Sequence, residues 1–145
     1  MLTLRLQNRI EQLVELERSV RTFAEQQAIP GQRALGLQLV LEELVTNVIE
    51  HGHDDGRGHE IVVRLALSGP DLTMEVEDDG RPFDPLGAPR PDVDAPVAER
   101  PVGGLGLHLV RSHVDELRYR RADGKNLTTL VVRGILGGQG PPDVR

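Results

Sequence analysis

The chain has 145 residues, and apolar residues together with glycine make up about half of it, which is typical of one domain with a buried core and excludes wholesale disorder. The absence of cysteine excludes a disulfide scaffold, a thiolate metal site and a cysteine nucleophile. A net charge of −6 and only three aromatic residues, Phe23, Phe83 and Tyr119, argue against direct binding to nucleic acid or to an anionic membrane.

The N-terminal stretch carries Arg5 and Arg9 and lacks the long apolar run of a signal peptide. No apolar stretch approaches the roughly 20 residues that cross a bilayer. We therefore expect a cytoplasmic protein without a membrane partner.

Apolar and polar residues alternate over residues 2–6, which predicts a short strand. From residue 10 onward, apolar side chains recur every three or four positions, and this period predicts a helix that ends at Pro30. A second helix is expected from about residue 32 to about residue 51, followed by a polar loop over residues 51–59.

Four further strands are expected, in two hairpin pairs on either side of a long loop. They cover residues 60–67, 72–77, 117–121 and 127–133. The loop holds six of the ten prolines and five of the sixteen glycines between residues 80 and 106, and long loops of this kind commonly cover active sites. A third helix is expected to begin near Gly104.

Hairpin-length turns require antiparallel pairing of the strands that they join. We therefore predict an α+β fold, a two-layer sandwich in which a mostly antiparallel, mixed sheet carries three helices on one face. This order of elements excludes a doubly wound Rossmann domain. We expect one domain over residues 1–134 and a flexible tail over residues 135–145.

Glu43, Asn47 and His51 follow one another at four-residue steps on the second predicted helix, so their side chains share one stripe. An amide oxygen in an apolar helix can ligate a hard cation such as Mg²⁺. A carboxylate one turn away can accept a proton from a hydroxyl that attacks a phosphate. The same pattern also fits the solvated edge of an amphipathic helix.

Two other motifs could contact a ligand. Asp78 ends a predicted strand, where its carboxylate can accept a hydrogen bond from the amino group of a base, and Gly80 lets a ring approach the backbone. Glycines at residues 103, 104 and 106 precede the third helix, where backbone N–H groups can bind phosphate. Each motif also occurs as ordinary loop sequence.

The polar loop offers an alternative kind of site. His51, His53 and His59, with Asp54 and Asp55, contain two histidines one residue apart, a spacing that can bind Zn²⁺ or Ni²⁺. The sequence shows no regular element that would fix the geometry of this loop, so we do not expect a dedicated metal site there.

The three motifs resemble, in order and spacing, the N, G1 and G2 boxes of the GHKL ATP-binding superfamily, which includes histidine kinases, gyrase and Hsp90. The matching segments are Glu43-Leu-Val-Thr-Asn47, Asp78-Asp-Gly80 and Gly104-Leu-Gly106. The compact chain, the DDGRPFDP version of the second box and the segment GGLGLHLVRSHVDELRY most resemble the anti-sigma-factor serine kinases of the RsbW type. The resemblance spans roughly residues 5–133 and implies the Bergerat ATP-binding fold.

The resemblance also implies ATP or ADP and Mg²⁺ as ligands. Glu43 would be the general base that activates a serine hydroxyl, and Asn47 would ligate Mg²⁺. Asp78 would accept a hydrogen bond from the adenine amino group, with Gly80 beside the ring, under a lid formed by residues 86–102. The other implied nucleotide contacts are His51, Arg100, Gly103, Gly104, Leu105, Gly106, Leu107, and Thr128 or Thr129.

Three positions depart from the family pattern. Pro82 replaces the second glycine of the G1 box, and Leu127 replaces a glycine that often precedes the threonine pair. Relatives carry a basic residue directly before the G2 glycines; here Val102 stands nearest, and Arg100 is the candidate for that role.

Two functions remain open. In the first, the protein is a serine/threonine kinase and anti-sigma factor that phosphorylates a STAS-type anti-sigma-factor antagonist. In the second, it is a nucleotide-gated module that sequesters a sigma factor or another regulator without phosphotransfer. Glu43 favours the enzyme, whereas the missing basic residue before Gly103 favours the module. The resemblance also implies a homodimer.

Overall fold

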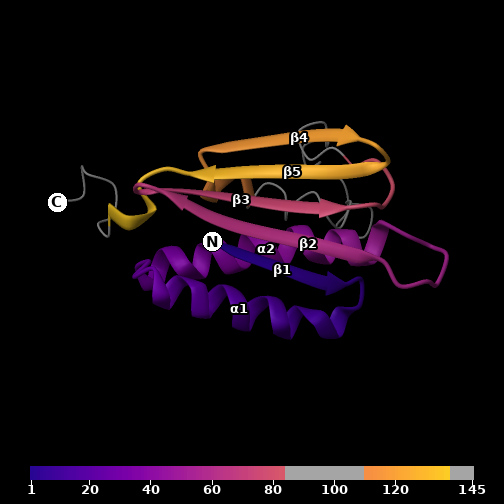
Figure 1. The fold of residues 1–145 in the computed structure, drawn as a ribbon, viewed down its shortest axis with the longest axis horizontal. Helices are drawn as coiled ribbons and strands as arrows, with labels where there is room; N and C mark the ends of the chain where they lie inside the picture. Colours follow the sequence, from indigo (N-terminus) through magenta and orange to yellow (C-terminus); the bar gives the residue numbers. More distant parts are fainter. Residues whose placement is uncertain (84–109, 138–145) are drawn as a thin grey trace, which may run out of the picture.

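Five strands form one sheet in the computed structural model, which describes residues 1–83 and 110–137 (Figure 1). The strand order is β1-β2-β3-β5-β4, and all four neighbouring pairs are antiparallel. The predicted α+β class is therefore confirmed, and the described sheet is antiparallel throughout. The strands are β1 (Leu2–Gln7), β2 (Glu60–Ser68), β3 (Asp71–Asp78), β4 (Glu116–Ala122) and β5 (Lys125–Val132).

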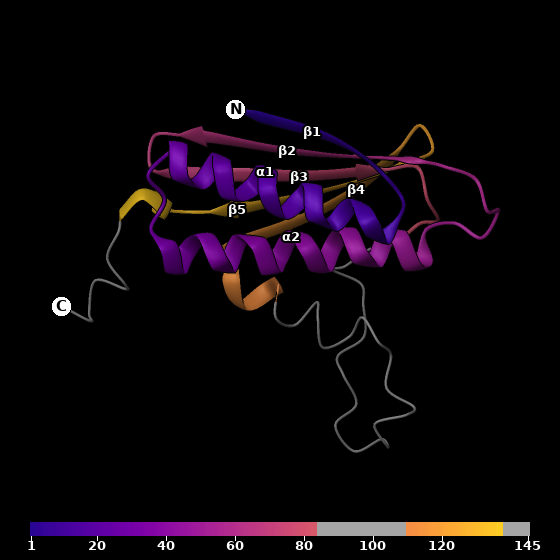
Figure 2. The ribbon, with the colours of Figure 1, turned by 90° about the horizontal axis from the view of Figure 1, so that it is seen from below.

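Two long helices, α1 (Leu13–Gln26) and α2 (Gly31–His51), pack against the same face of this sheet (Figure 2). Pro30 is the N-cap of α2, as its fixed φ permits. Two short 3₁₀ turns are present: η1 (Ile10–Gln12) joins β1 to α1, and η3 (Ile135–Gly137) follows β5. Residues 110–113 are helical and form the end of the third predicted helix; its expected start near Gly104 lies outside the described residues.

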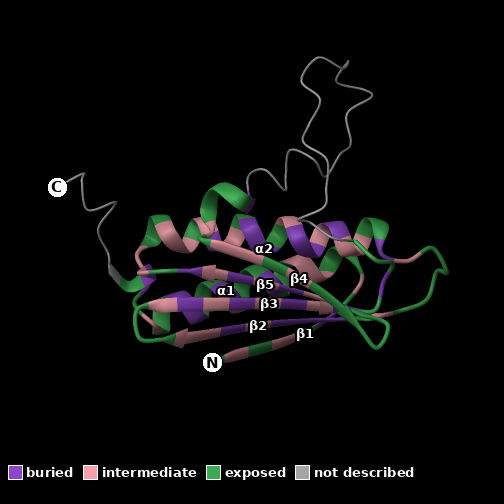
Figure 3. Cartoon of the chain, turned by 90° about the horizontal axis from the view of Figure 1, so that it is seen from above, coloured by how far each residue is buried: buried purple, intermediate pink, exposed green. Residues whose placement is uncertain are grey.

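The core lies between the helices and the sheet, where buried positions alternate along the strands (Figure 3). In β3 the residues Leu72, Met74 and Val76 are buried, and the period of two brings Asp78 to the same side. Register pairs Asp78 with Asn126 and Val76 with Thr128 of β5. The apolar rows of two neighbouring strands thus end in polar side chains at one end of the core.

The opposite face of the sheet is polar. The guanidinium of Arg64 in β2 lies 3.7 Å from Glu75 Oε1 and 3.5 Å from Glu77 Oε1 of β3. Lys125 Nζ of β5 lies 3.5 Å from Glu77 Oε2. Such half-exposed ion pairs contribute roughly 0–1 kcal/mol each. These ion pairs therefore contribute little to the stability of the fold. Most of the stabilisation comes from the apolar side chains buried between the other face of the sheet and the helices α1 and α2.

Ile135 is only 1% exposed and belongs to the core, so the packed chain extends at least to this residue. The rest of the predicted tail, residues 138–145, and the predicted lid, residues 86–102, lie outside the described residues. No helix within residues 1–83 or 110–137 combines the length and apolar character that crossing a membrane requires.

Candidate functional site

A cavity of about 150 Å³ lies between the C-terminal half of α2 and the ends of β3 and β5. Four polar side chains are buried in the described part of the chain, and all four line this cavity. Burial of polar groups costs free energy unless they find partners, so their concentration here indicates a site that binds a ligand. The four are Asn47, Asp78, Asn126 and Thr128. The remaining lining residues are Leu44, Val48, His51, Gly52, Val76, Arg81, Pro82 and Phe83.

Asp78 presents a carboxylate at the end of β3, where the sheet leaves the core. Its Oδ2 atom accepts hydrogen bonds from Gly80 N at 2.8 Å and from Asn126 Nδ2 at 3.1 Å. Burial raises the pKa of Asp78 above its usual value, while these two hydrogen bonds and His53 lower it and Asp79 raises it further. Both described hydrogen bonds use Oδ2, which leaves Oδ1 available to accept one from a ligand.

Asn126 of β5 holds the chain that follows β3 in place. Its Nδ2 donates to Asp78 Oδ2 and, at 2.8 Å, to the carbonyl oxygen of Arg81. Its Oδ1 accepts hydrogen bonds from Tyr119 Oη at 2.5 Å and from an Arg121 guanidinium nitrogen at 2.9 Å. The side chain therefore connects β4, β5 and the loop at the cavity, and orients the Asp78 carboxylate.

Gly52 and Gly80 meet backbone to backbone beside the cavity. A Cβ atom on Gly80 would lie 2.9 Å from both the Cα and the carbonyl oxygen of Gly52, and 2.8 Å from Asp78 Oδ2. The Arg81 N–H donates to the carbonyl oxygen of Gly52 at 3.0 Å. Only glycine at position 80 permits this approach, which joins the end of α2 to the loop after β3.

Asn47 is the only polar residue of α2 that is buried. Its side-chain Nδ2 is buried and has no hydrogen-bond partner among the described residues. A buried amide N–H that the described residues leave unpaired needs an acceptor, which a bound ligand can supply. An amide oxygen at this position also fits the hard oxygen ligand that Mg²⁺ prefers.

The other two residues of the predicted stripe lie nearer to solvent. Glu43 is one helical turn before Asn47, about 6 Å along the axis, and does not line the cavity. Partial burial raises its pKa, and the negative charges of Glu50 and Glu42 add to this effect. His51 lines the cavity, but its side chain is 54% exposed.

The structure separates the two threonines. Thr128 is buried and lines the cavity, whereas Thr129 points to the opposite, polar face of the sheet because neighbouring strand residues alternate. The remaining predicted contacts lie outside the described residues: Arg100, Gly103, Gly104, Leu105, Gly106 and Leu107.

Several lining residues were missed by the sequence analysis. Phe83 stands next to the Asp78 motif in a chain with three aromatic residues, and this rarity was a usable signal. Asn126 had none, because its importance arises from strand register with β3 and contacts with β4.

The family model described as the histidine kinase-like ATPase domain matches residues 6–132. Among curated proteins, the serine/threonine-protein kinase BtrW of Bordetella bronchiseptica is 30% identical over 94 residues, which cover 65% of this chain and 66% of BtrW. The serine-protein kinase RsbW of Bacillus cereus is 28% identical over 103 residues, covering 68% of this chain and 62% of that protein. The chain thus spans slightly less than two thirds of these relatives.

Solved structures show the same fold. The RsbU and RsbW domains of Rv1364c from Mycobacterium tuberculosis give a TM-score of 0.63 at 20% identity, over 92% of this chain and 32% of that one. The catalytic domain of the histidine kinase ThkA gives 0.52 at 15% identity, over 92% of this chain and 97% of that one.

Proposed function

The chain belongs to the histidine kinase-like ATPase domain family, and on this basis we propose that it is an ATP-dependent serine/threonine kinase. We propose further that it acts as an anti-sigma factor whose substrate is a STAS-type anti-sigma-factor antagonist. The observation that carries the proposal is the cavity in which Asp78 and Asn47, from different elements, are buried together.

The cavity suits a planar base with an amino group. Asp78 Oδ1 accepts a hydrogen bond from the amino group of adenine, and Thr128 lines the same cavity. Leu44 and Val76 supply apolar walls. The volume of about 150 Å³ is below the roughly 300–1,000 Å³ of pockets that enclose drug-sized ligands. The cavity therefore holds the base, and the ribose and phosphates extend beyond it.

Asn47 and Glu43 have different roles at the phosphates: one binds the metal ion and the other accepts a proton. Asn47 would hold Mg²⁺ through its amide oxygen, and the ion supplies neutralisation of phosphate charge when bound. Glu43 accepts the proton of the serine hydroxyl as the serine oxygen bonds to the γ-phosphorus and the bond to the ADP oxygen breaks. Its raised pKa makes it a stronger base than an exposed glutamate.

Phosphotransfer is tested with γ-labelled ATP, Mg²⁺ and a STAS-domain antagonist. We expect label on a serine or threonine of the antagonist.

Calorimetry should show ATP binding that weakens about 10- to 100-fold in Asp78→Asn, because a charged acceptor is lost. Asp123→Asn, in the exposed β4–β5 turn, is the matched control and should bind as the wild type does.

Tight binding of ATP and Mg²⁺ without any transfer would overturn the kinase assignment. The protein would then be a nucleotide-gated module that sequesters a sigma factor or another regulator.

We propose that the chain is a homodimer in either case, and light scattering should then give twice the 16.0 kDa of one chain.

A further inference from the structure

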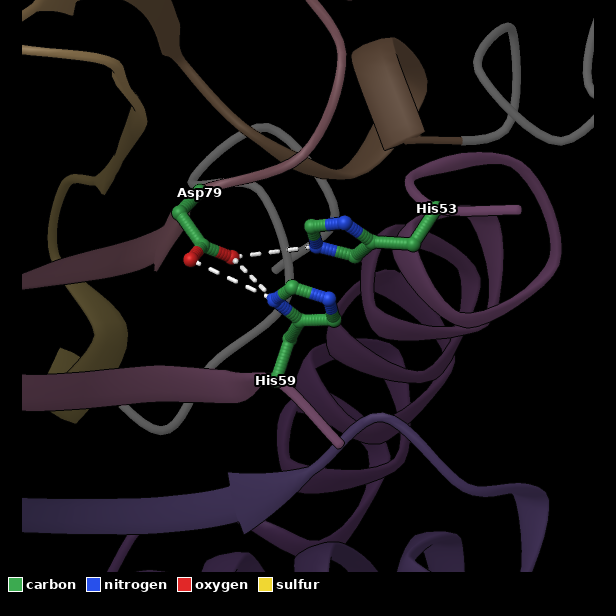
Figure 4. Close-up of side chains that lie close together, drawn as sticks. All are labelled: His53, His59 and Asp79. Atoms are coloured by element: carbon green, nitrogen blue, oxygen red, sulfur yellow. Dashed lines mark hydrogen bonds and ion pairs between the residues drawn. The ribbon is translucent and has the colours of Figure 1, made fainter. Parts of the chain in front are cut away.

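His53, His59 and Asp79 form a cluster outside the cavity (Figure 4). The two imidazole rings, both from the loop between α2 and β2, stack with centroids 3.4 Å apart and an angle of 3° between their planes. Each ring turns a nitrogen toward the Asp79 carboxylate: His53 Nε2 lies 3.0 Å from Oδ1, and His59 Nδ1 lies 3.4 Å from Oδ1.

The carboxylates of the cluster favour a positive charge beside them, because hydrogen bonds from His59 to Asp55 and Asp79 raise the pKa of His59. A neutral imidazole has one N–H donor and one acceptor nitrogen. Both nitrogens of His59 face carboxylates, since Nδ1 faces Asp79 and Nε2 lies 2.9 Å from Asp55 Oδ2. His53 Nε2 is buried and, despite its 3.0 Å approach to Asp79, is outside hydrogen-bond geometry. A cation between the rings and Asp79 would satisfy all of these atoms.

We propose that His53 Nε2, His59 Nδ1 and an Asp79 carboxylate oxygen bind a divalent transition metal ion of the Zn²⁺ class. The three ligand atoms lie within 4.8 Å of one another. Metal–ligand distances of 2.0–2.1 Å in a tetrahedral site require ligand atoms about 3.3 Å apart, and the two nitrogen–oxygen distances, 3.0 and 3.4 Å, bracket this value. A bound metal would require the stacked rings to tilt so that their in-plane lone pairs converge, and water would supply a fourth ligand.

Asp55 supports the site from behind. It faces the second nitrogen of His59, as carboxylates commonly do with metal-bound histidines, and so fixes the tautomer in which Nδ1 is the ligand. The Asp55 carboxylate is itself held by a hydrogen bond from Arg57 N at 3.0 Å.

The loop has the scaffold that its sequence did not reveal. His59 is tied to Asn8 twice, because its N–H donates to Asn8 Oδ1 and its carbonyl oxygen accepts from Asn8 N, both at 2.9 Å. Asp79 is fixed by its position directly after β3. The ligands also differ from those that the sequence analysis considered, since exposed His51 is not part of the cluster and Asp54 pairs with Arg81 instead.

The proposed metal site is chemically separate from the nucleotide site. Imidazole nitrogens favour Zn²⁺, Co²⁺ and Ni²⁺, whereas Mg²⁺ prefers oxygen ligands. None of the three ligands lines the cavity. The proposal therefore stands independently of the proposed kinase activity, and its test contains no nucleotide.

The test is a titration of untagged protein, stripped of metal by a chelator, with Co²⁺, followed by competition with Zn²⁺. We expect one equivalent of Co²⁺ to give the visible absorption of a tetrahedral site. Asp55→Asn should weaken binding about 10- to 100-fold, and His53→Gln, His59→Gln and Asp79→Asn should weaken it further. Asp54→Asn, a neighbouring exposed carboxylate outside the cluster, should bind as the wild type does.

Wild-type binding in the three ligand variants, or no visible Co²⁺ spectrum in the wild type, would overturn the proposal. Circular dichroism establishes that each variant is folded. A second measurement needs no variant: Zn²⁺ should protect His53 and His59 from diethylpyrocarbonate while leaving His51 reactive. Equal reactivity of all three with and without Zn²⁺ would also overturn it.

Discussion

At the scale of single residues, burial raises the pKa values of two carboxylates, Asp78 and Glu43, whose surroundings otherwise differ. Burial dominates at Asp78, but hydrogen bonds from Gly80 and Asn126 oppose it, which suits a group that accepts hydrogen bonds while ionised. Glu43 has partial burial and two negative neighbours, Glu50 and Glu42, which suit a group that takes up a proton. Under the proposed function, Asp78 would bind the base and Glu43 would accept the proton.

The role of Glu43 predicts a specific pH dependence. A general base acts when deprotonated, so the transfer rate should fall as the pH is lowered through the pKa of Glu43, at a pH above that expected for an exposed glutamate. Glu43→Gln should retain ATP binding and lose at least about 100-fold in transfer rate, the low end of general-base contributions.

Glu42→Gln is the matched control for this prediction, since Glu42 is the exposed neighbour on the same turn. It should keep the transfer rate at neutral pH, and the inflection should move slightly to lower pH because Glu43 loses a negative neighbour. An unchanged profile in Glu43→Gln would remove Glu43 from the proposed mechanism.

At the scale of elements, the site depends on how β5 is placed between β3 and β4. This position lets Asn126 bridge Tyr119 of β4 to the Asp78 carboxylate of β3. Because Asn126 is buried, its removal takes a hydrogen-bond partner from Asp78 Oδ2, Tyr119 Oη and the carbonyl oxygen of Arg81.

Asn126→Ala should therefore lower the free energy of unfolding by about 1–3 kcal/mol, and it should weaken ATP binding because Asp78 loses its orienting donor. Urea denaturation and calorimetry measure the two effects. Thr73→Ala, on the polar face of β3, is the control and should change stability by about 0.5 kcal/mol or less. Full ATP affinity in a destabilised Asn126→Ala would restrict Asn126 to a structural role.

The same scale explains what could be predicted from the sequence. Period-two and three-to-four-residue patterns, which are local, predicted the five strands and both long helices within a few residues of their observed bounds. The choice between Thr128 and Thr129, by contrast, required the register with β3. The cluster of His53, His59 and Asp79 required knowing that the loop before β2 lies beside the end of β3, a contact between distant segments.

At the scale of the whole molecule, the cavity joins α2, β3 and β5, so a ligand bound there contacts both layers of the core. ATP with Mg²⁺ at 100 times its dissociation constant should stabilise the native state by about 2.7 kcal/mol. For a chain of this size, that raises the melting temperature by about 5–10 °C. Differential scanning calorimetry should show this shift in the wild type and a much smaller one in Asp78→Asn at the same ATP concentration.

The contact between Gly52 and Gly80 constrains how this site can change during evolution. A Cβ atom on Gly80 would lie 2.9 Å from the Gly52 backbone, and one on Gly52 would lie 2.6 Å from the carbonyl oxygen of Val48, so neither position has room for a side chain. A lineage that acquires a different nucleotide preference must therefore vary the surrounding walls, such as Phe83 and Thr128, while this pair of glycines stays fixed. Variation in the walls with invariance of the pair is the pattern expected in an alignment of relatives.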